Sequence, residues 1–329
     1  MNILSPMPTG NGAHVVHKLL ESHLDDYSVC DYHPVRTYFP PLLWQCCREG
    51  NPSLIHTTPD HGLFFLRHNA PMVLTFHNYV LDWSMQNYGS LLQRLHWRTD
   101  LRWLTRKALD RADKVTAVSD FTASLVHSDL GFKGDIQVIP NGVDTSIFFP
   151  GLDRSDDGVV RVLFSGNPTA RKGAQWLKGI AGLLQSGIEI WCTGGLRGAT
   201  EDTAGQRIRY LGPISYMDMP AVYREADMLL LPTVREGHSL AVLEAMASGL
   251  PVVASRCSSL PEQVIEGEGG CLVDVGDVQQ YAAAIHNLAE DQEARDAMGA
   301  FNRRRTEQVF PLQRMISTYR ELFSSAYEK

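Results

Sequence analysis

Two acidic residues flank a short polar loop between an apolar strand and an apolar helix. Glu236 and Glu244 lie eight positions apart within the segment from Leu229 to Val253. The apolar run before them ends at Pro232, and Ser239 suits the N-cap of the helix that follows. Because that helix is apolar all round apart from Glu244, we expect it to be buried.

Glu244 is thus predicted to be a carboxylate in a buried helix, with no Lys or Arg within four residues of it. A buried polar group without a partner costs ~1–3 kcal/mol, so something must hydrogen-bond it. Hydroxyls of a bound ligand would do so, and so would solvent or a basic residue from elsewhere in the fold. The residues alone leave both interpretations open. The free N–H groups at the start of the helix suit an anionic ligand.

A second candidate site follows the apolar run Val159–Ser165. It consists of Gly166, a short loop and the pair Arg171-Lys172 before a helix. A strand–glycine–helix corner with a lysine is a reasonable phosphate site, because cations there can neutralise a leaving diphosphate as its charge develops. The plainer interpretation of Arg171 and Lys172 is a solvated helix start.

Short apolar runs closed by Pro, Asn, Asp or Ser alternate with helical patterns, as in an open α/β sheet. Near-continuous apolar strands imply parallel sheets covered on both faces, which bind ligands at the carboxyl ends of their strands. The predicted strands are Asn2–Met7, Ser53–Thr57, Met72–His77, Lys114–Ser119, Asp135–Pro140, Val159–Ser165, Gly187–Cys192, Arg207–Leu211, Met228–Pro232 and Pro251–Ser255. The predicted helices are Ala13–Leu24, Ala174–Gln185, Met217–Ala226, Ser239–Ser248, Asp277–Glu290, Gln292–Glu307 and Pro311–Tyr327.

The length of 329 residues predicts about two domains. The polar stretch 151–158 is the best boundary, which gives an N-terminal domain at 1–150, a C-terminal domain at 151–310 and a final helix at 311–329. Composition is globular, with 44% hydrophobic and 20% charged residues. The net charge of −7 argues against a nucleic-acid partner.

Six cysteines show no C-x-x-C spacing, and two of them, Cys46 and Cys47, are adjacent. We therefore expect reduced thiols in a reducing compartment. The N-terminus lacks a signal-peptide pattern and no apolar run approaches the ~20 residues of a membrane span, which predicts a cytoplasmic protein. No Asp-x-Asp motif offers a metal site, since Asp25-Asp26 and Asp156-Asp157 are adjacent pairs in polar stretches.

The Glu236-x7-Glu244 segment resembles the E-x7-E segment of retaining glycosyltransferases of family 4. Its context, Arg-Glu-Gly-His-Ser-Leu followed by Glu-Ala-Met-Ala-Ser-Gly-Leu-Pro-Val-Val, matches over about 25 residues. The resemblance implies the GT-B fold, with two Rossmann-like, doubly wound parallel-sheet domains facing a central cleft. It also implies a nucleoside-diphosphate sugar, UDP or GDP, bound by the second domain.

The resemblance assigns roles in the second domain residue by residue. It implies that Glu236 lies near the donor sugar and that Glu244 binds the ribose hydroxyls. The backbone amides expected to face the sugar and the diphosphate are those of Gly237, His238, Ser239 and Leu240. In the family pattern Gly-Arg, four residues, Lys-Gly, this chain keeps Gly166, Lys172 and Gly173 but has Asn167 where the arginine is usual. Arg171 could replace that arginine. The nucleotide base is expected near Gly212.

In the first domain, His77 lies at the end of an apolar strand. A lone histidine is often structural, but the family places one here beside the donor sugar and phosphate. Gly10 and Gly12 resemble the family's glycine-rich loop, where the acceptor or the diphosphate approaches. A full Gly-x-Gly-x-x-Gly is absent because position 15 is Val15, which disfavours a dinucleotide-dependent oxidoreductase. The segment from Val138 to Pro150 is similar to the family's interdomain segment.

A basic helix is predicted from Leu91 to Lys114, which holds seven Lys/Arg and three Asp for a local net charge of 7 − 3 = +4. Arginines recur at 94, 98, 102 and 106, and Trp97, Leu101, Leu104 and Ala108 form an apolar stripe at helical spacing. One interpretation is an ordinary surface helix. The other is a contact with an anionic membrane or a lipid-phosphate acceptor.

Together these features predict a metal-independent, retaining glycosyltransferase of the hexosyltransferase type, without a cofactor. We expect His77, Lys172 and Glu236 to be catalytic. The acceptor would be a sugar or a lipid-linked sugar in the synthesis of cell-surface polysaccharide, glycolipid or another glycoconjugate, at the inner face of the plasma membrane where the basic helix makes contact. The alternatives are a non-catalytic nucleotide-sugar-binding subunit that supports a partner transferase, and a GT-B epimerase or phosphorylase.

Overall fold

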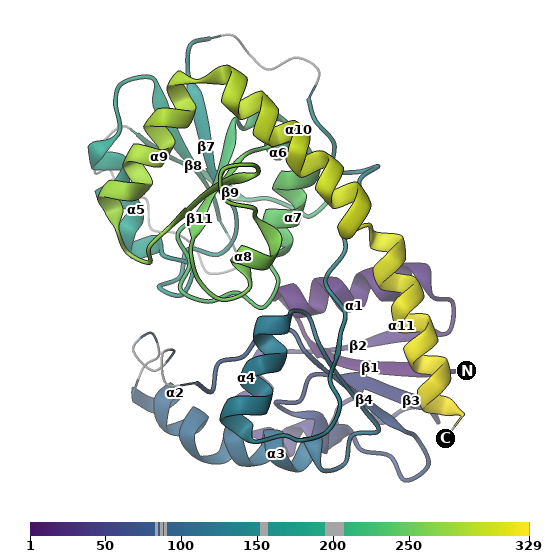
Figure 1. Ribbon diagram of the computed structural model, residues 1–329. Coiled ribbons are helices and arrows are strands. Elements are labelled where there is room, and N and C mark those ends of the chain that lie inside the picture. The colour runs from purple at the N-terminus through teal and green to yellow at the C-terminus, as the bar shows by residue number, and fades with distance from the viewer. Residues whose placement is uncertain (83–84, 86–87, 89–90, 152–156, 195–206, 329) are drawn as a thin grey trace. The chain divides into compact units, whose positions relative to one another are not determined.

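The computed structural model describes all residues except 83–84, 86–87, 89–90, 152–156, 195–206 and 329. The chain forms two compact units (Figure 1), the first of residues Met1–Asn141 and Gln313–Lys329, the second of residues Gly142–Leu312. Each unit has its own six-stranded sheet. The two are described separately below.

The sheet of the first unit is parallel throughout, in the order β2-β1-β3-β4-β5-β6. Its order reverses direction between β1 and β3, which is the point where ligands bind in such sheets. The strands are β1 (Ile3–Pro8), β2 (Tyr27–Tyr32), β3 (Leu54–Thr57), β4 (Met72–Phe76), β5 (Lys114–Ala117) and β6 (Gln137–Val138).

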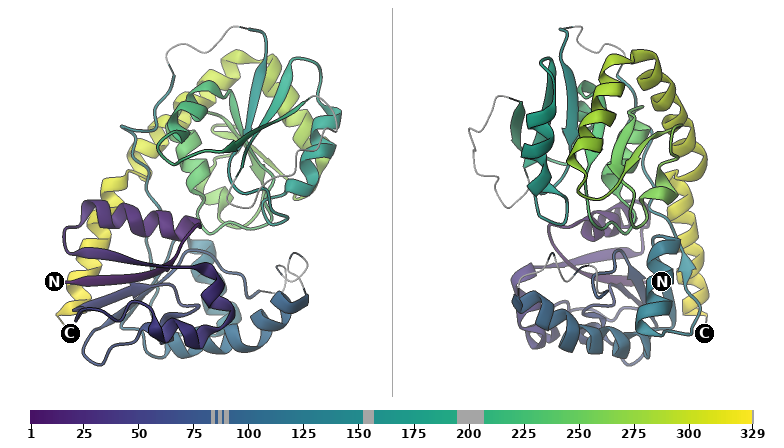
Figure 2. Two further views of the ribbon diagram at one scale, coloured as in Figure 1. Left: turned by 180° about the vertical axis from the view of Figure 1, so that it is seen from behind. Right: turned by 60° about the vertical axis from the view of Figure 1, so that its left-hand side comes forward.

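Helices lie on both faces of this sheet (Figure 2). They are α1 (Gly12–His23), α2 (Leu91–His96), α3 (Arg102–Leu109), α4 (Asp120–Leu130) and α11 (Leu312–Tyr327), with 3-10 turns η1 (Pro34–Tyr38), η2 (Pro40–Gln45) and η3 (Gly62–Phe65) and a π turn η5 (Trp97–Leu101). Asn11 caps α1 by accepting a hydrogen bond from the amide of His14, which ties the glycine-rich loop to the helix start. From Gln313 onward, α11 belongs to this unit, where Phe323 packs 5.8 Å from the ring of Tyr27.

The sheet of the second unit is also parallel, in the order β12-β11-β10-β7-β8-β9. Counted from its own first strand, this is the Rossmann order, with the reversal between β7 and β10. The strands are β7 (Val160–Phe164), β8 (Ile188–Gly194), β9 (Ile208–Pro213), β10 (Met228–Leu231), β11 (Val252–Ser255) and β12 (Gly270–Val273). The helices are α5 (Ala174–Leu183), α6 (Met219–Glu225), α7 (Leu240–Ala247), α8 (Leu260–Gln263), α9 (Val278–Glu290) and α10 (Gln292–Val309).

Strand β10 shows how the second sheet is held between two layers of helices. Met228 and Leu230 face the core beneath α5 and α9, whereas Leu229 and Leu231 face the core beneath α6 and α7. All four are 0% exposed. Each leucine buried in this way contributes roughly 1.5–3 kcal/mol, so the strand is anchored from both faces and the loop after it starts from a rigid base.

The boundary between the units differs from the predicted one. The compact units divide at Asn141 and Gly142, inside the segment similar to the family's interdomain segment, and not at 150 and 151. Val143 donates its amide hydrogen to Phe310 O, which holds the start of the second unit against its end. Most of the polar stretch 151–158 that suggested the later boundary, including Asp156, lies outside the described residues.

The expectation of six reduced cysteines is wrong for one pair. Cys30 on β2 and Cys47 after η2 form a disulfide, with 5.8 Å between their Cα atoms. Sequence spacing could not reveal it, because the partners come from a strand and a loop that meet only in the fold. Cys46, Cys192, Cys257 and Cys271 are free.

Gly173 closes the corner between the phosphate-type loop and α5. Its φ of +82° lies in the left-handed region, where a side chain causes strain. A Cβ atom there would sit 1.9 Å from the carbonyl oxygen of Pro232, at the end of β10. The two loops at the carboxyl ends of β7 and β10 therefore touch at a point that admits only glycine.

We expect Gly173→Ala to lower the free energy of unfolding by about 3 kcal/mol or more, because the new methyl group meets backbone in a strained conformation. The matched control is Gly182→Ala, at an exposed position on α5 where a Cβ meets nothing within 4 Å. That control should be neutral or stabilise by up to about 1 kcal/mol. Urea unfolding curves of both variants and the wild type test this, and equal curves for the two variants would contradict it.

Candidate functional site

Glu236 lies in the loop after β10 and is only 6% exposed. Its Oε1 accepts from Lys172 Nζ at 2.8 Å and from the Thr233 hydroxyl at 2.9 Å, and lies 3.4 Å from Arg171 Nη1. The two predicted site segments, one after β7 and one after β10, thus meet through an ion pair. Because β7 and β10 are neighbours in the sheet, their carboxyl ends bring these loops together at the reversal of strand order.

Backbone contacts reinforce this junction. The amide of Val234 donates to the carbonyl oxygen of Arg171 at 2.9 Å, and Thr233 Oγ1 lies 2.9 Å from the same oxygen. Arg171 Nη1 in turn donates to the carbonyl oxygen of Arg235 at 2.7 Å. Arg171 is therefore part of the loop junction, which is a different environment from the solvated helix start considered above.

Burial and ion pairing shift the pKa values of Glu236 and Lys172 in opposite directions. Burial alone would raise the pKa of Glu236, but Lys172, Arg171 and the hydrogen bonds outweigh it and hold that pKa below its ordinary value. Burial lowers the pKa of Lys172, and Glu236 opposes that shift. The result is a buried carboxylate and a half-buried ammonium that satisfy each other.

Glu244 lies on α7, 9% exposed, and its partner is a hydroxyl rather than a cation. Tyr223 of α6 donates to Glu244 Oε2 at 2.8 Å. Burial raises the pKa of Glu244 to about 7, against smaller opposing effects of Tyr223 and Lys172. The sequence left open whether ligand hydroxyls, or else solvent or a basic residue, satisfy Glu244. The structure adds a partner outside both interpretations, because Tyr223 meets one carboxylate oxygen.

The loop before α7 matches the prediction in part. Ser239 caps the helix, as predicted, by accepting from the amide of Val242 at 3.4 Å. Its own amide, expected to face the diphosphate, instead donates to Gln263 Oε1 at 2.8 Å. Gln263 also donates to Ser239 O at 3.0 Å and so closes a two-bond clamp within the protein, whereas the contact of this amide with a diphosphate stays a prediction. The side chain of His238 is buried 5.2 Å from the Phe310 ring. Gly237 and Leu240 lie in the same loop and first helical turn.

The loop after β7 carries three other predicted residues. Gly166 has a φ of +123°, and its amide donates to the Thr193 hydroxyl at 2.9 Å. The side-chain oxygen of Asn167 is buried and has no hydrogen-bond partner among the described residues. Gly212 lies on β9 opposite Thr193, at a register shift of the β8–β9 pair.

The remaining predicted residues belong to the first unit. Gly10 and Gly12 follow β1, and His77 follows β4. The His77 ring is half-buried, and its Nε2 lies 2.9 Å from Nε2 of His17 on α1. Burial lowers the pKa of His77 to about 3, so the ring is neutral at ordinary pH.

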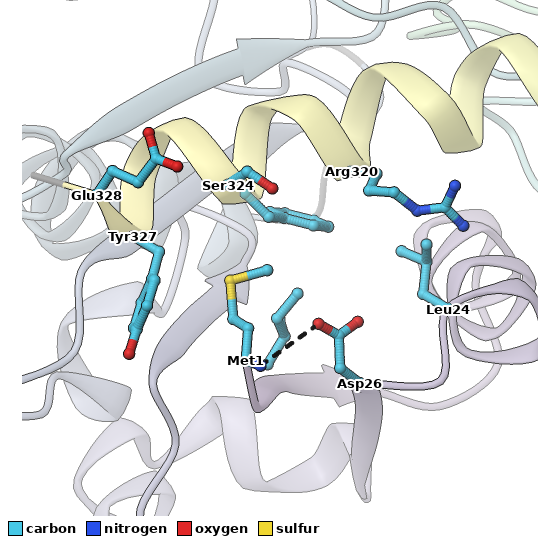
Figure 3. Close-up of a pocket in the computed structure, with 9 residues that line it drawn as sticks. Met1, Leu24, Asp26, Arg320, Ser324, Tyr327 and Glu328 are labelled. Carbon is cyan, nitrogen blue, oxygen red and sulfur yellow. Dashed lines mark ion pairs between the residues drawn. The ribbon is translucent and has the colours of Figure 1, made fainter.

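A pocket of this unit lies elsewhere, at the amino-terminal edge of its sheet. Figure 3 shows it between the start of β1 and the last turns of α11, with Met1, Asp26, Arg320 and Tyr327 around it. The N-terminal ammonium lies 3.9 Å from Asp26 there. Since catalytic sites of parallel sheets form at the carboxyl ends of strands, this pocket is no substitute for the loops described above.

Sequence reasoning missed three residues that organise these sites. Thr233, Tyr223 and Gln263 contact Glu236, Glu244 and Ser239 respectively. Thr233 directly follows a predicted strand, a position that could have signalled its role. Tyr223 and Gln263 carry no local signal, because their partners are distant in sequence.

In the part of the chain that the structure describes, no group of three His, Cys, Asp or Glu side chains is arranged to hold a metal ion. Within the same residues, none of the helices has the length and apolar character needed to cross a bilayer.

Both halves of the chain match glycosyltransferase family models. Residues 3–147 match the model described as Glycosyltransferase Family 4, and residues 160–291 match Glycosyl transferases group 1. The D-inositol 3-phosphate glycosyltransferase of Corynebacterium efficiens is 35% identical over 222 residues, which cover 59% of this chain and 52% of that protein. The chain spans about half the length of the curated relatives it matches.

The fold of nearly the whole chain is similar to solved structures. Sucrose-phosphate synthase from Thermosynechococcus elongatus superposes with a TM-score of 0.82 at 18% identity, covering 99% of this chain and 100% of that one. Its two halves resemble family-4 and group-1 glycosyltransferases in sequence, and its fold is GT-B. Anabaena Alr3699/HepE, solved in complex with UDP and glucose, has a TM-score of 0.79 at 18% identity, with 99% and 100% coverage.

The raised pKa of Glu244 makes the stability of this glycosyltransferase fold pH-dependent. In the unfolded chain the group titrates near 4.5, and in the folded protein near 7. Between these values the folded protein holds a proton that the unfolded chain has lost. The free energy of unfolding therefore falls as the pH rises through this range, by up to about 3 kcal/mol.

Glu244→Gln should abolish this component, because glutamine does not titrate yet can still accept from Tyr223. Urea unfolding between pH 5 and pH 8 should show a smaller loss of stability in Glu244→Gln than in the wild type. Glu321→Gln, at an exposed site on α11, controls for the change in net charge. Parallel pH profiles for the wild type and Glu244→Gln would contradict the assignment.

Proposed function

We propose that this protein transfers a hexose from a nucleoside-diphosphate sugar to an acceptor hydroxyl with retention of anomeric configuration. The observation that carries the proposal is the junction of Glu236 with Lys172 at the carboxyl ends of β7 and β10. It joins the two segments that resemble the donor site of family 4. The D-inositol 3-phosphate glycosyltransferase relatives and the UDP-containing structure of Alr3699/HepE support a sugar nucleotide as donor.

The donor would be held by groups from both loops. Lys172 and Arg171 would meet the diphosphate, while Glu236 would approach the hydroxyls of the donor sugar. Thr233 keeps a hydrogen bond to Glu236 when Lys172 turns toward phosphate, so the carboxylate is never left without a partner. Glu244 would receive the ribose hydroxyls on Oε1, with Oε2 held by Tyr223. The amides of Gly237, His238 and Leu240 would complete the site.

The chemistry would need no protein nucleophile. As the bond between the anomeric carbon and the diphosphate oxygen breaks, negative charge grows on the leaving group, and Lys172 and Arg171 stabilise it. The leaving diphosphate would accept the proton of the acceptor hydroxyl, which attacks from the same face. Asn167, in place of the usual arginine, would contribute a neutral amide, so the cationic role would fall to Arg171 and Lys172.

The direct test incubates the protein with UDP-, GDP-, dTDP- and ADP-sugars and a panel of sugar and lipid-linked acceptors. Product NMR should show the anomeric configuration of the donor. An inverted product would refute retention. Release of free nucleotide without acceptor would favour the epimerase, and binding without turnover would favour the non-catalytic subunit.

Lys172→Met should lower kcat by about 10²-fold or more, because charge on the diphosphate is greatest in the transition state. Lys178→Met, an exposed lysine on α5, is the control and should retain activity. Thermal melts separate lost catalysis from lost folding, since removing one partner of a buried pair also destabilises. A variant that keeps kcat but binds donor weakly would contradict a role for Lys172 in the transition state.

We also propose that the first unit contacts an anionic membrane that carries the acceptor. The predicted basic helix is shorter than expected, since α3 ends at Leu109, and Arg102 is committed to Asp129 at 2.7 Å. Arg98 and Arg106 remain exposed. The first unit also exposes apolar side chains on α2 and α3 (Leu91, Leu95 and Trp103) and on and between η1 and η2 (Val35, Tyr38, Phe39, Leu42 and Trp44).

The elements η2 and α3, which carry part of these two groups of exposed apolar residues, pack on the same hydrophobic core. Leu43 of η2 and Leu104 of α3 pack into the same core with Phe64 of η3. Aromatic side chains next to cations are typical of proteins that lie on a membrane surface. Leu101, Leu104 and Ala108 of the predicted apolar stripe are buried. Only residues of the basic helix outside this stripe could therefore contact lipid.

Sedimentation with vesicles of phosphatidylcholine, with or without phosphatidylglycerol, tests this contact. We expect binding only to the anionic vesicles, weakened by salt and reduced in Arg98→Gln/Arg106→Gln. Lys133→Gln/Arg304→Gln removes two exposed cations outside these segments and should bind like the wild type. Equal, weak binding to both vesicle types would refute the proposal.

A further inference from the structure

A chain of buried polar side chains crosses the core of the first unit and ends at His77. Each member comes from a different element, and all except His77 are at most 4% exposed. The members are Ser5 (β1), His17 (α1), Tyr27 (β2), His56 (β3), Thr75 (β4), Thr116 (β5) and His77. A polar chain in such a core is expensive to maintain unless every member is satisfied.

Each link of this chain is a short hydrogen bond. The rings of His17 and His56 stack with 4.4 Å between their centroids, and Tyr319 and Phe323 of α11 pack against His56. The links are Thr116 Oγ1 to Thr75 Oγ1 (2.7 Å), Thr75 Oγ1 to His56 Nε2 (2.7 Å), His56 Nδ1 to Tyr27 Oη (2.7 Å), Tyr27 Oη to His17 Nδ1 (2.7 Å) and His17 Nε2 to His77 Nε2 (2.9 Å).

The three histidines in this chain are neutral. Burial and their mutual proximity lower the pKa values of His17 and His56 well below the ordinary range, and burial lowers that of His77. A neutral imidazole carries one N–H and one lone pair. The position of the hydrogen on one ring therefore determines its position on the next ring along the chain.

The contacts of His17 Nδ1 indicate which ring nitrogens carry the hydrogens. Two hydroxyl oxygens approach its Nδ1, Ser5 Oγ at 2.6 Å and Tyr27 Oη at 2.7 Å. A single in-plane lone pair cannot accept from both, whereas one N–H can be shared between two acceptor oxygens. Two oxygens this close to one ring nitrogen favour hydrogen on Nδ1 of His17, which leaves the lone pair on Nε2.

The rest follows link by link. His77 must donate its Nε2–H to His17 Nε2, which leaves the lone pair of His77 on Nδ1. In the other direction, Tyr27 donates to His56 Nδ1, and His56 donates through Nε2–H to Thr75. In this arrangement the three histidine rings leave one nitrogen without a partner: among the described residues, His77 Nδ1 is buried and makes no hydrogen bond. An orphaned acceptor of this kind calls for an explanation, and a hydroxyl donor from a bound ligand would supply one.

We propose that His17 is a positioning residue that holds His77 in the tautomer whose Nδ1 accepts a hydrogen bond from a carbohydrate hydroxyl. The identity of that ligand rests on the proposed function, whereas the tautomer rests on the geometry of the first unit alone. In the opposite tautomer, Nδ1 would carry hydrogen and would meet a carbonyl or phosphate oxygen instead. The chain thus selects hydroxyl groups over anionic groups at this nitrogen.

Long-range ¹H–¹⁵N NMR of the ¹⁵N-histidine-labelled wild-type protein, without any substrate, tests the tautomers. Protonated and unprotonated ring nitrogens have distinct ¹⁵N shifts, and His17→Gln and His77→Gln spectra assign the signals. We expect hydrogen on Nδ1 of His17 and on Nε2 of His77. Hydrogen on Nδ1 of His77, or averaged signals from both tautomers, would overturn the proposal.

Kinetics test the positioning role with two variants of His17. The amide oxygen of His17→Gln can accept from His77 Nε2–H, whereas His17→Met cannot. We expect His17→Met to lower kcat/KM about tenfold, and His17→Gln to recover most of that loss. His127→Gln, an exposed histidine of α4 outside the chain, is the control and should match the wild type.

Equal losses in His17→Gln and His17→Met would mean that His17 acts only through packing, and would refute the positioning role. If His17→Met does not fold, the wild-type spectrum still decides the tautomer. A wild-type protein with the expected tautomers that turns over no sugar nucleotide would refute the proposed function and the hydroxyl ligand, but not the tautomer.

Discussion

A buried polar group must find a partner, and this constraint shapes both units. In the second unit the carboxylate of Glu236 is buried at the meeting point of two loops, and Lys172 and Thr233 satisfy it. Desolvating an ion pair is costly, and a hydrophobic pair would often be at least as stable. The pair is therefore weak evidence for a stabilising role. Its place at the carboxyl ends of β7 and β10 is what favours function.

The same constraint has a different solution at Glu244. Burial raises the pKa of this carboxyl group, and its hydrogen bond from Tyr223 does not outweigh burial as the cations beside Glu236 do. The two acids of one motif thus differ in charge near neutral pH because their neighbours differ. Under the proposed function, the charged Glu236 would lie next to developing positive charge on the donor sugar, and Glu244, near its titration point, would exchange hydrogen bonds with ribose hydroxyls. Spacing along the chain could not distinguish these roles.

Much of the fold could be predicted because the central strands of a parallel sheet are apolar on both faces, as Met228 to Leu231 show. The elements that escaped prediction lack that pattern. β2 is an edge strand with polar residues, and β12 is a short edge strand. Partners of site residues were harder still. Gln263, 24 positions away in sequence, accepts a hydrogen bond from the Ser239 amide. The Cys30–Cys47 disulfide joins a strand and a loop that no sequence-spacing rule connects.

The histidine chain shows why such partners matter for chemistry. His77 was predicted from its place after a strand and from a family likeness, both of which concern position alone. What His77 can do depends on which nitrogen holds the hydrogen, and that depends on His17 and, through it, on Ser5 and Tyr27. These residues come from three other elements of the sheet and its helices. The packing of the first unit therefore determines the hydrogen-bonding character of His77, just as the loop junction of the second unit determines the charge of Glu236.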